Sequence, residues 1–256
     1  MADGMLEQTL RLRRGHEQIV YTVGTGDPVL WLHDLNGVTD DNPLVASLAE
    51  HYTVIAPQAP GFAHLEELDD IRNVHELALH YDDVLQALGV GPIDVVGHSF
   101  GAMIGAELAA HFPLRVSRLV LLAPLGLWNE HYPIGDLLSV PYPALPEFLY
   151  ARPPGAAGPD AMDVEALVRI AQGMTSVAKF IWPIPEHGLS RRLDRYTGPT
   201  MVMFGGADEF IPSAYADDWT NLLPNVRRAI LPHAKHMLPA DEPAEVSKLV
   251  LDFLSA

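Results

Sequence analysis

Residues 97–101 read Gly97-His98-Ser99-Phe100-Gly101, and this stretch decides the fold class. It follows a short apolar run and precedes a segment with helical character, which predicts a sharp turn from a strand into a helix. Such a turn holds its central residue in a strained backbone conformation and projects that side chain above the sheet. The two glycines leave room for the strand and helix to approach. The pattern therefore predicts that Ser99 is a nucleophile.

A nucleophilic serine needs a histidine base and an acid that orients the base, and the later part of the chain supplies both. The apolar segment 200–204 is typical of a buried strand, and Asp208 follows it. A second apolar segment, 228–232, leads to His236. The order nucleophile, acid and histidine predicts a catalytic triad of Ser99, Asp208 and His236.

Five separated segments resemble the α/β-hydrolase superfamily of capped serine hydrolases, and the likeness covers nearly the whole chain. This resemblance implies an α/β-hydrolase fold: a mostly parallel eight-stranded sheet with helices on both faces and an inserted cap. The matching segments are 29–33, a strand entering the oxyanion loop; 59–62, with a Pro-Gly-Phe turn; 97–101, around the nucleophile; 204–208, the acid loop; and His236 with Asp241 and Pro243, an H-x4-[DE]-x-P ending.

Each member of the triad except the serine has a local alternative. His233 lies close to His236, but only His236 has the family's acidic residue and proline five and seven positions later. Asp208 could instead cap the helix expected near Pro212, since aspartate is common at helix N-termini. Glu209 is the other acid in that loop, although the family pattern places the acid at Asp208.

The resemblance implies an oxyanion hole made by the backbone N–H groups of Leu35 and Phe100. The main departure from the family is Asp34, which stands where relatives usually have glycine. Aspartate tolerates the left-handed backbone region, so the loop conformation can be preserved. Asp34 could be a loop residue bonded to nearby backbone, or it could contact substrate or handle a proton. His98 is expected to be structural because alternate strand-end residues face away from the site.

The segment between the strands near 118–123 and 200–204 differs from the rest of the chain. Residues 124–185 hold 10 of the 22 prolines and many of the aromatic residues. We therefore predict a core domain of residues 1–123 and 196–256 and a cap of residues 124–195. Binding clefts are mostly apolar, so we expect Leu125, Trp128, Trp182 and Met237 to join Asp34 in contacting the substrate.

The predicted function is a serine hydrolase that acts through an acyl-enzyme on an ester or lactone with a bulky apolar or aromatic portion. Hydrolysis of a C–C bond in dienone-type acids is the alternative reaction. A hydrolase-fold receptor and a lyase are alternatives of another class, both suggested by Asp34. A peptidase that captures an amino terminus would need acidic residues in the cap, and Glu130, Asp136, Glu147 and Glu186 are candidates.

The composition indicates where in the cell the protein works and which kinds of partner it binds. A net charge of −17 disfavours nucleic acid and anionic lipid, and no apolar stretch is long enough to span a membrane. The absence of cysteine and of a visible signal segment favours a cytoplasmic protein, a monomer or homodimer with a small-molecule substrate. No cofactor is expected. No metal site is expected either, because the spacing of His75 and His80 does not place them on one helical face.

Overall fold

The structure is a computed structural model that describes residues 4–153 and 164–256, and its frame is one eight-stranded sheet. The strand order is β1-β2-β4-β3-β5-β6-β7-β8. The β1–β2 and β2–β4 pairs are antiparallel and the other five pairs are parallel, which confirms the predicted sheet. The strands are β1 (Leu6–Arg11), β2 (Glu17–Val23), β3 (Asp27–Leu32), β4 (Tyr52–Pro57), β5 (Ile93–His98), β6 (Val116–Leu122), β7 (Thr200–Gly205) and β8 (Val226–Leu231).

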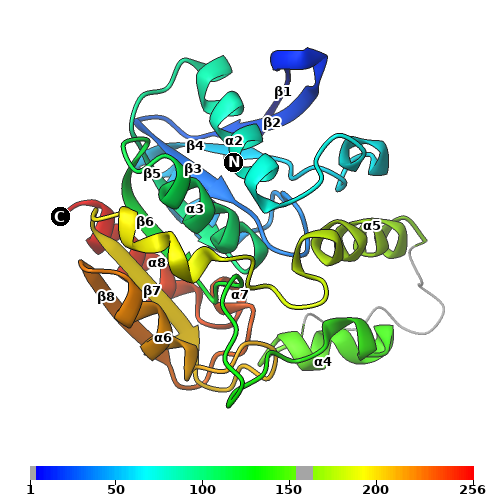
Figure 1. Cartoon of the computed structure of the whole chain (residues 1–256), viewed down its shortest axis with the longest axis vertical. Coiled ribbons are helices and arrows are strands. Elements are labelled where there is room, and N and C mark those ends of the chain that lie inside the picture. Colours follow the sequence, from blue (N-terminus) through cyan, green and yellow to red (C-terminus); the bar gives the residue numbers. More distant parts are fainter. Residues whose placement is uncertain (1–3, 154–163) are drawn as a thin grey trace.

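Helices cover both faces of the sheet because its strands carry apolar side chains on both sides. In β3, Leu30 and Leu32 join one core cluster, whereas Val29 and Trp31 join the other. The first cluster holds α2 (Val74–Leu88), α3 (Phe100–His111) and α6 (Tyr215–Leu222). The second holds α1 (Pro43–Ala49), α7 (Leu238–Asp241) and α8 (Pro243–Leu254). The result is the predicted three-layer arrangement (Figure 1).

The segment between β6 and β7 is an insertion into this sheet topology. It contains α4 (Leu145–Leu149) and α5 (Val164–Ile181), which Figure 1 shows on the same side of the molecule. Residues 154–163 of the predicted cap lie outside the described residues. Short 3-10 helices complete the chain: Arg13–Gly15, Leu65–Leu68, Leu137–Ser139, Tyr142–Ala144, Leu189–Arg191 and Leu193–Arg195.

The turn between β5 and α3 has the strained geometry that the sequence predicts. Ser99 has φ 56° and ψ −114°, outside the regions that most residues adopt. A Cβ atom at Gly101 would lie 2.0 Å from the carbonyl oxygen of Leu32, and one at Gly97 would lie 2.5 Å from that of Gly101. These contacts explain why only glycine fits on either side of the serine.

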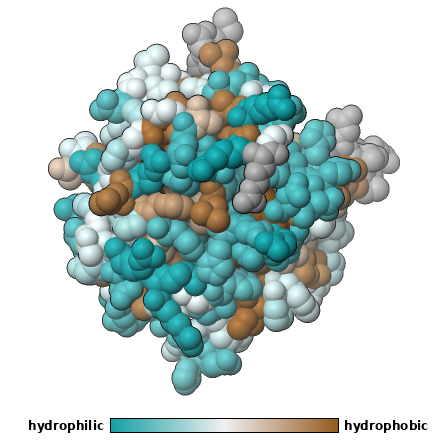
Figure 2. All heavy atoms as spheres, turned by 45° about the horizontal axis from the view of Figure 1, so that its top comes forward, coloured by the Kyte–Doolittle hydropathy of each residue, from teal (hydrophilic) through white to brown (hydrophobic). Residues whose placement is uncertain are grey.

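The face of the molecule that Figure 2 shows is mostly polar. On the face in Figure 2, hydrophilic residues cover most of the area and apolar residues are scattered among them. In residues 4–153 and 164–256, no helix combines the length and the hydropathy needed to cross a bilayer.

Candidate active site

The three predicted triad residues meet at the carboxyl edge of the sheet. Ser99 begins the turn after β5, Asp208 follows β7, and His236 follows β8. The Nε2 atom of His236 lies 2.8 Å from Oγ of Ser99, and its Nδ1 lies 2.9 Å from Oδ2 of Asp208. Ser99 and His236 have no exposed surface. The structure therefore brings together side chains that lie more than 100 positions apart along the chain.

The hydrogen bonds of Asp208 fix the roles of the two imidazole nitrogens. Its Oδ1 accepts from the N–H groups of Phe210 and Ile211, at 2.8 and 3.0 Å. The other oxygen is then free to accept from Nδ1–H of His236. This tautomer leaves the Nε2 lone pair facing the hydroxyl of Ser99, which is the arrangement a general base requires.

Glu209 and His233, the local alternatives to Asp208 and His236, do not take part in these contacts. Glu209 points to Lys235, with 2.5 Å between Oε1 and Nζ, so this acid does not serve His236. His233 is exposed, unlike the buried His236. Asp208 does bond the backbone of the following turn, and this capping role coexists with its contact to the imidazole.

The two predicted oxyanion donors, the N–H groups of Phe100 and Leu35, both belong to buried residues. Phe100 is the first residue of α3, so its N–H has no acceptor within the helix. Leu35 lies in the loop after β3 and is also buried. Helix α5 approaches this loop so closely that a Cβ atom at Gly173 would lie 2.8 Å from the carbonyl oxygen of Leu35.

His33 holds the start of the oxyanion loop. Its Nε2 accepts from the N–H of Ala59 at 2.8 Å, and its Nδ1–H donates to the carbonyl oxygen of Asp34 at 2.7 Å. These partners require a neutral ring. Burial lowers the pKa of His33, which agrees with that state.

Both carboxylate oxygens of Asp34 are occupied by groups of the protein. Oδ1 accepts from the N–H of Asn36 at 2.7 Å, and Oδ2 lies 2.8 Å from Nδ1 of His98. The residue is 5% exposed. The side chain thus makes the loop bond that one interpretation of the sequence expected, and it also contacts His98, which the sequence did not single out as its partner.

His98 carries a positive charge in this arrangement. Its Nε2 lies 2.9 Å from the carbonyl oxygen of His236, which can only accept, and its Nδ1 faces the Asp34 carboxylate. Burial opposes the charge on His98, but the bond and charge of Asp34 outweigh it and raise the pKa of the ring. Burial likewise opposes ionisation of Asp34, yet His98 holds the pKa of Asp34 below its usual value.

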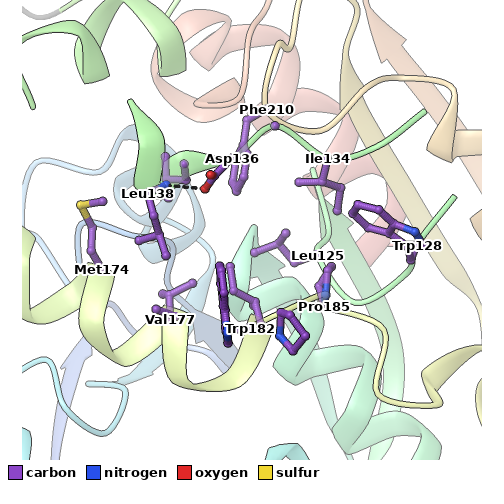
Figure 3. Close-up of a pocket in the computed structure, with 15 residues that line it drawn as sticks. Leu125, Trp128, Ile134, Asp136, Leu138, Met174, Val177, Trp182, Pro185 and Phe210 are labelled. Atoms are coloured by element: carbon purple, nitrogen blue, oxygen red, sulfur yellow. Dashed lines mark hydrogen bonds between the residues drawn. The ribbon is translucent and has the colours of Figure 1, made fainter. Parts of the chain in front are cut away.

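Figure 3 shows residues that line a largely apolar cavity of about 240 Å³. Three of the predicted substrate contacts, Leu125, Trp128 and Trp182, line it. Two lining residues touch the triad: the N–H of Leu125 donates to the carbonyl oxygen of Ser99, and the ring of Phe210 packs edge-on against His236. The one charged residue among its described lining residues is Asp136, whose carboxylate caps the N–H of Leu138.

A second apolar cavity, of about 220 Å³, lies on the side of the oxyanion loop. Leu35, Leu149 and Ile170 contribute to its wall, and Leu137 and Met174 line both cavities. None of the described residues lining this second cavity is charged. The sequence did not single out Leu137, Met174 or Phe210, because no motif distinguishes a cavity wall from other apolar positions.

The remaining two predicted substrate contacts lie in a third, polar cavity of about 180 Å³. Asp34 and Met237 line it together with His98 and Tyr150. Met237 is 2% exposed, and its N–H donates to the carbonyl oxygen of Leu149 in α4. These two residues are therefore separated from the three that line the first cavity.

Comparison with known proteins identifies the family. Residues 24–249 match the alpha/beta hydrolase family, and the chain belongs to it. It is 25% identical over 264 residues to 2-hydroxy-6-oxo-2,4-heptadienoate hydrolase of Pseudomonas putida, covering 96% of this chain and 95% of that one. It is 23% identical over 227 residues to RutD of Shigella flexneri, provisionally named a carbamate hydrolase, covering 84% and 85%.

A solved structure of similar fold is a bacterial membrane phospholipase A. It superposes with a TM-score of 0.84 at 21% identity, covering 98% of this chain and 86% of the other. This likeness concerns the fold. Together with the family match, the comparisons show that the protein is an enzyme of the α/β-hydrolase class.

Proposed function

We propose that the protein is a serine hydrolase that cleaves an uncharged ester or lactone through an acyl-enzyme at Ser99. One observation carries this proposal: the imidazole of His236 lies within hydrogen-bond distance of both Ser99 and Asp208. Acyl transfer requires a nucleophile, a base in contact with it and an acid that orients the base.

The proposed reaction has two halves. Nε2 of His236 takes the hydroxyl proton as Oγ of Ser99 attacks the substrate carbonyl, and the resulting imidazolium then protonates the leaving alcohol. His236 next takes a proton from water, which attacks the acyl-enzyme; the imidazolium then returns a proton to Oγ of Ser99 as the acid leaves. The N–H groups of Leu35 and Phe100 stabilise the oxyanion in each half.

The Asp34–His98 pair removes the electrostatic objection to an acidic residue in the oxyanion loop. A lone carboxylate beside a developing negative charge would oppose catalysis. The positive charge of His98, 2.8 Å from Asp34, compensates that carboxylate. We assign Asp34 and His98 as positioning residues that hold the oxyanion loop, the turn at Ser99 and the carbonyl of His236 in register.

The two apolar cavities support an uncharged substrate with apolar groups on both sides of the scissile bond. Of the charged residues, only Asp136 is among the described residues that line them, and it repels anions. Leu137 and Met174 line both cavities and belong to the segment that we propose acts as a cap. A substrate would place its acyl part in one cavity and its alcohol part in the other.

Hydrolysis of a C–C bond is the second candidate. The alignment with one relative covers 95% of that relative's length, and its name is that of a dienoate hydrolase. A dienoate is an anion and needs a cationic partner when it is desolvated. The described residues that line the two apolar cavities include no lysine or arginine. This favours the ester over the dienoate.

Direct competition of substrates tests the proposal. Purified protein is assayed with neutral aryl esters and lactones, with a 2-hydroxy-6-oxo-dienoate and with a carbamate, each also with Ser99→Ala. We expect kcat/KM to be highest for an ester or lactone and the activity to vanish in Ser99→Ala. A higher kcat/KM for the dienoate would replace the proposed reaction with C–C hydrolysis. Cleavage without incorporation of oxygen from labelled water would indicate a lyase, and ligand binding without turnover a receptor.

A further inference from the structure

Two histidines and a glutamate meet on the helical layer formed by α2 and α3. His75 lies in the first turn of α2, and Glu107 and His111 lie one turn apart on α3. One potential ligand atom from each residue lies within 4.8 Å of the other two. Helix α3 begins at Phe100 and ends at His111, so Glu107 and His111 lie about 12 and 18 Å along the helix from the nucleophile.

The two imidazole nitrogens are already near the spacing that a shared metal ion requires. Nδ1 of His75 lies 3.0 Å from Nε2 of His111. Two nitrogens bound to one tetrahedral ion at about 2.0–2.1 Å lie roughly 3.3 Å apart. A small outward movement of the exposed His75 ring would admit the ion.

The backbone fixes the tautomer of His111. Its Nδ1 lies 2.8 Å from the carbonyl oxygen of Glu107, which can only accept, so Nδ1 holds the proton. Nε2 therefore presents a lone pair toward His75. Histidine ligands of metal ions commonly donate their other ring N–H in this way.

Glu107 supplies an independent indication of a missing partner. The residue is 3% exposed, and Oε1 accepts from Arg192 at 2.6 Å. Oε2 is buried and has no hydrogen-bond partner. The nearest ring nitrogen, Nδ1 of His111 at 3.4 Å, already donates to the backbone carbonyl. An unpartnered buried acceptor is costly, and a cation would satisfy it.

We propose that His75, Glu107 and His111 bind one divalent transition-metal ion of the Zn²⁺ type, with water in the fourth position. Two imidazole nitrogens and one carboxylate oxygen suit Zn²⁺ or Co²⁺, whereas Mg²⁺ and Ca²⁺ prefer oxygen ligands. His75 moves its proton to Nε2 so that Nδ1 can coordinate. The ion joins α2 to α3 and stabilises the folded protein, independently of the hydrolase site.

Some charges of the protein oppose the binding of a cation at this site, and others favour it. The guanidinium of Arg192 opposes a second cation nearby, while it also anchors Glu107 through the other oxygen. The net charge of −17 favours cations over the molecule as a whole. From the sequence we expected no metal site, because we compared His75 only with the nearby His80. The residues that lie close to His75 in the structure, Glu107 and His111, come from another helix.

Metal titration of the full chain tests the proposal. After removal of metals with EDTA, Zn²⁺ is titrated by calorimetry and Co²⁺ by visible absorption, and Tm is measured with and without Zn²⁺. We expect one equivalent, a four-coordinate Co²⁺ spectrum and a higher Tm with Zn²⁺. His75→Asn and Glu107→Gln should each weaken binding by about tenfold or more. The exposed His131, changed to asparagine, is the matched control and should bind as the wild type does.

Two results would overturn the metal site. One is the absence of a tight equivalent, and the other is binding of several weak equivalents that His75→Asn and Glu107→Gln leave unchanged, which marks adventitious coordination by surface histidines. Because the readouts are stoichiometry, spectrum and Tm, they do not depend on whether the proposed ester hydrolysis is correct.

Discussion

Asp34 and His98 form a buried ion pair, with 2.8 Å between Oδ2 and Nδ1, that joins the oxyanion loop to the residue before the nucleophile. His98 also bonds the carbonyl oxygen of His236, so one imidazolium at the end of β5 connects the loop of Asp34 to the loop of His236. A glycine at position 34 could not make this connection. The departure from the family pattern is thus accompanied by a compensating charge.

Removing the charge of Asp34 should destabilise the fold. In Asp34→Asn the buried imidazolium of His98 loses its counterion, and breaking one side of a buried pair costs about 3 kcal/mol. Urea unfolding at pH 6 measures this free energy. Asp40→Asn, an exposed position in the same loop, is the control and should change stability by less than about 0.5 kcal/mol. Equal stabilities for the two variants would show that the pair is not ionised.

The ion pair should also give stability a defined dependence on pH. The raised pKa of His98 means that its contribution is complete below about 6.5 and declines as pH rises through the folded pKa. The lowered pKa of Asp34 means that its contribution is lost only below about 3.8. The stability difference between wild type and His98→Gln should therefore be largest between about pH 4 and 6.5.

Unfolding free energies of these two proteins from pH 5 to 9 provide the check. The other groups that face His98 are Asp208 and the ring of His236, and both are present in each protein. A difference that stays constant across this range would contradict a charged His98.

The acid of the triad can be distinguished from its neighbour by mutation. Asp208→Asn can no longer fix the tautomer of His236, and kcat for the best ester should fall roughly 10³- to 10⁴-fold. Glu209→Gln removes a contact to Lys235 on the surface and should leave kcat within about twofold. A comparable loss in both variants would mean that the loop, rather than the Asp208 carboxylate, controls activity.

The apolar cavity in Figure 3 should set the size of one substrate group. Ala178 lines this cavity, and Ala178→Phe would fill part of it. Each methylene that loses its contact costs about 0.8 kcal/mol, so three methylenes correspond to a loss of roughly fiftyfold in kcat/KM. Esters with a long chain on one side should lose activity, while acetyl esters keep theirs. A uniform loss across the series would assign the cavity no role in substrate selection.

The sequence predicted the elements that depend on local pattern. The strands expected near 29–33, 118–123, 200–204 and 228–232 are β3, β6, β7 and β8, with boundaries that differ by a few residues. The positions of Ser99, Asp208 and His236 followed from strand ends, because parallel strands bring their carboxyl ends to one edge.

The contacts that sequence could not predict join residues far apart without a motif. Asp34 and His98 are 64 positions apart, and each alone is an ordinary polar residue at a strand end. The same holds for His75 and His111, which are 36 positions apart on different helices. Only the packing of β3 beside β5 and of α2 beside α3 brings these pairs together.

Intact-mass spectrometry after treatment with a fluorophosphonate tests the central claim, an activated nucleophile at Ser99. We predict a single adduct on the wild type, no adduct on Ser99→Ala and a strongly slowed reaction of His236→Ala. Folded wild-type protein that takes up no adduct, or a Ser99→Ala variant that still reacts, would contradict the assignment of this site as a serine hydrolase.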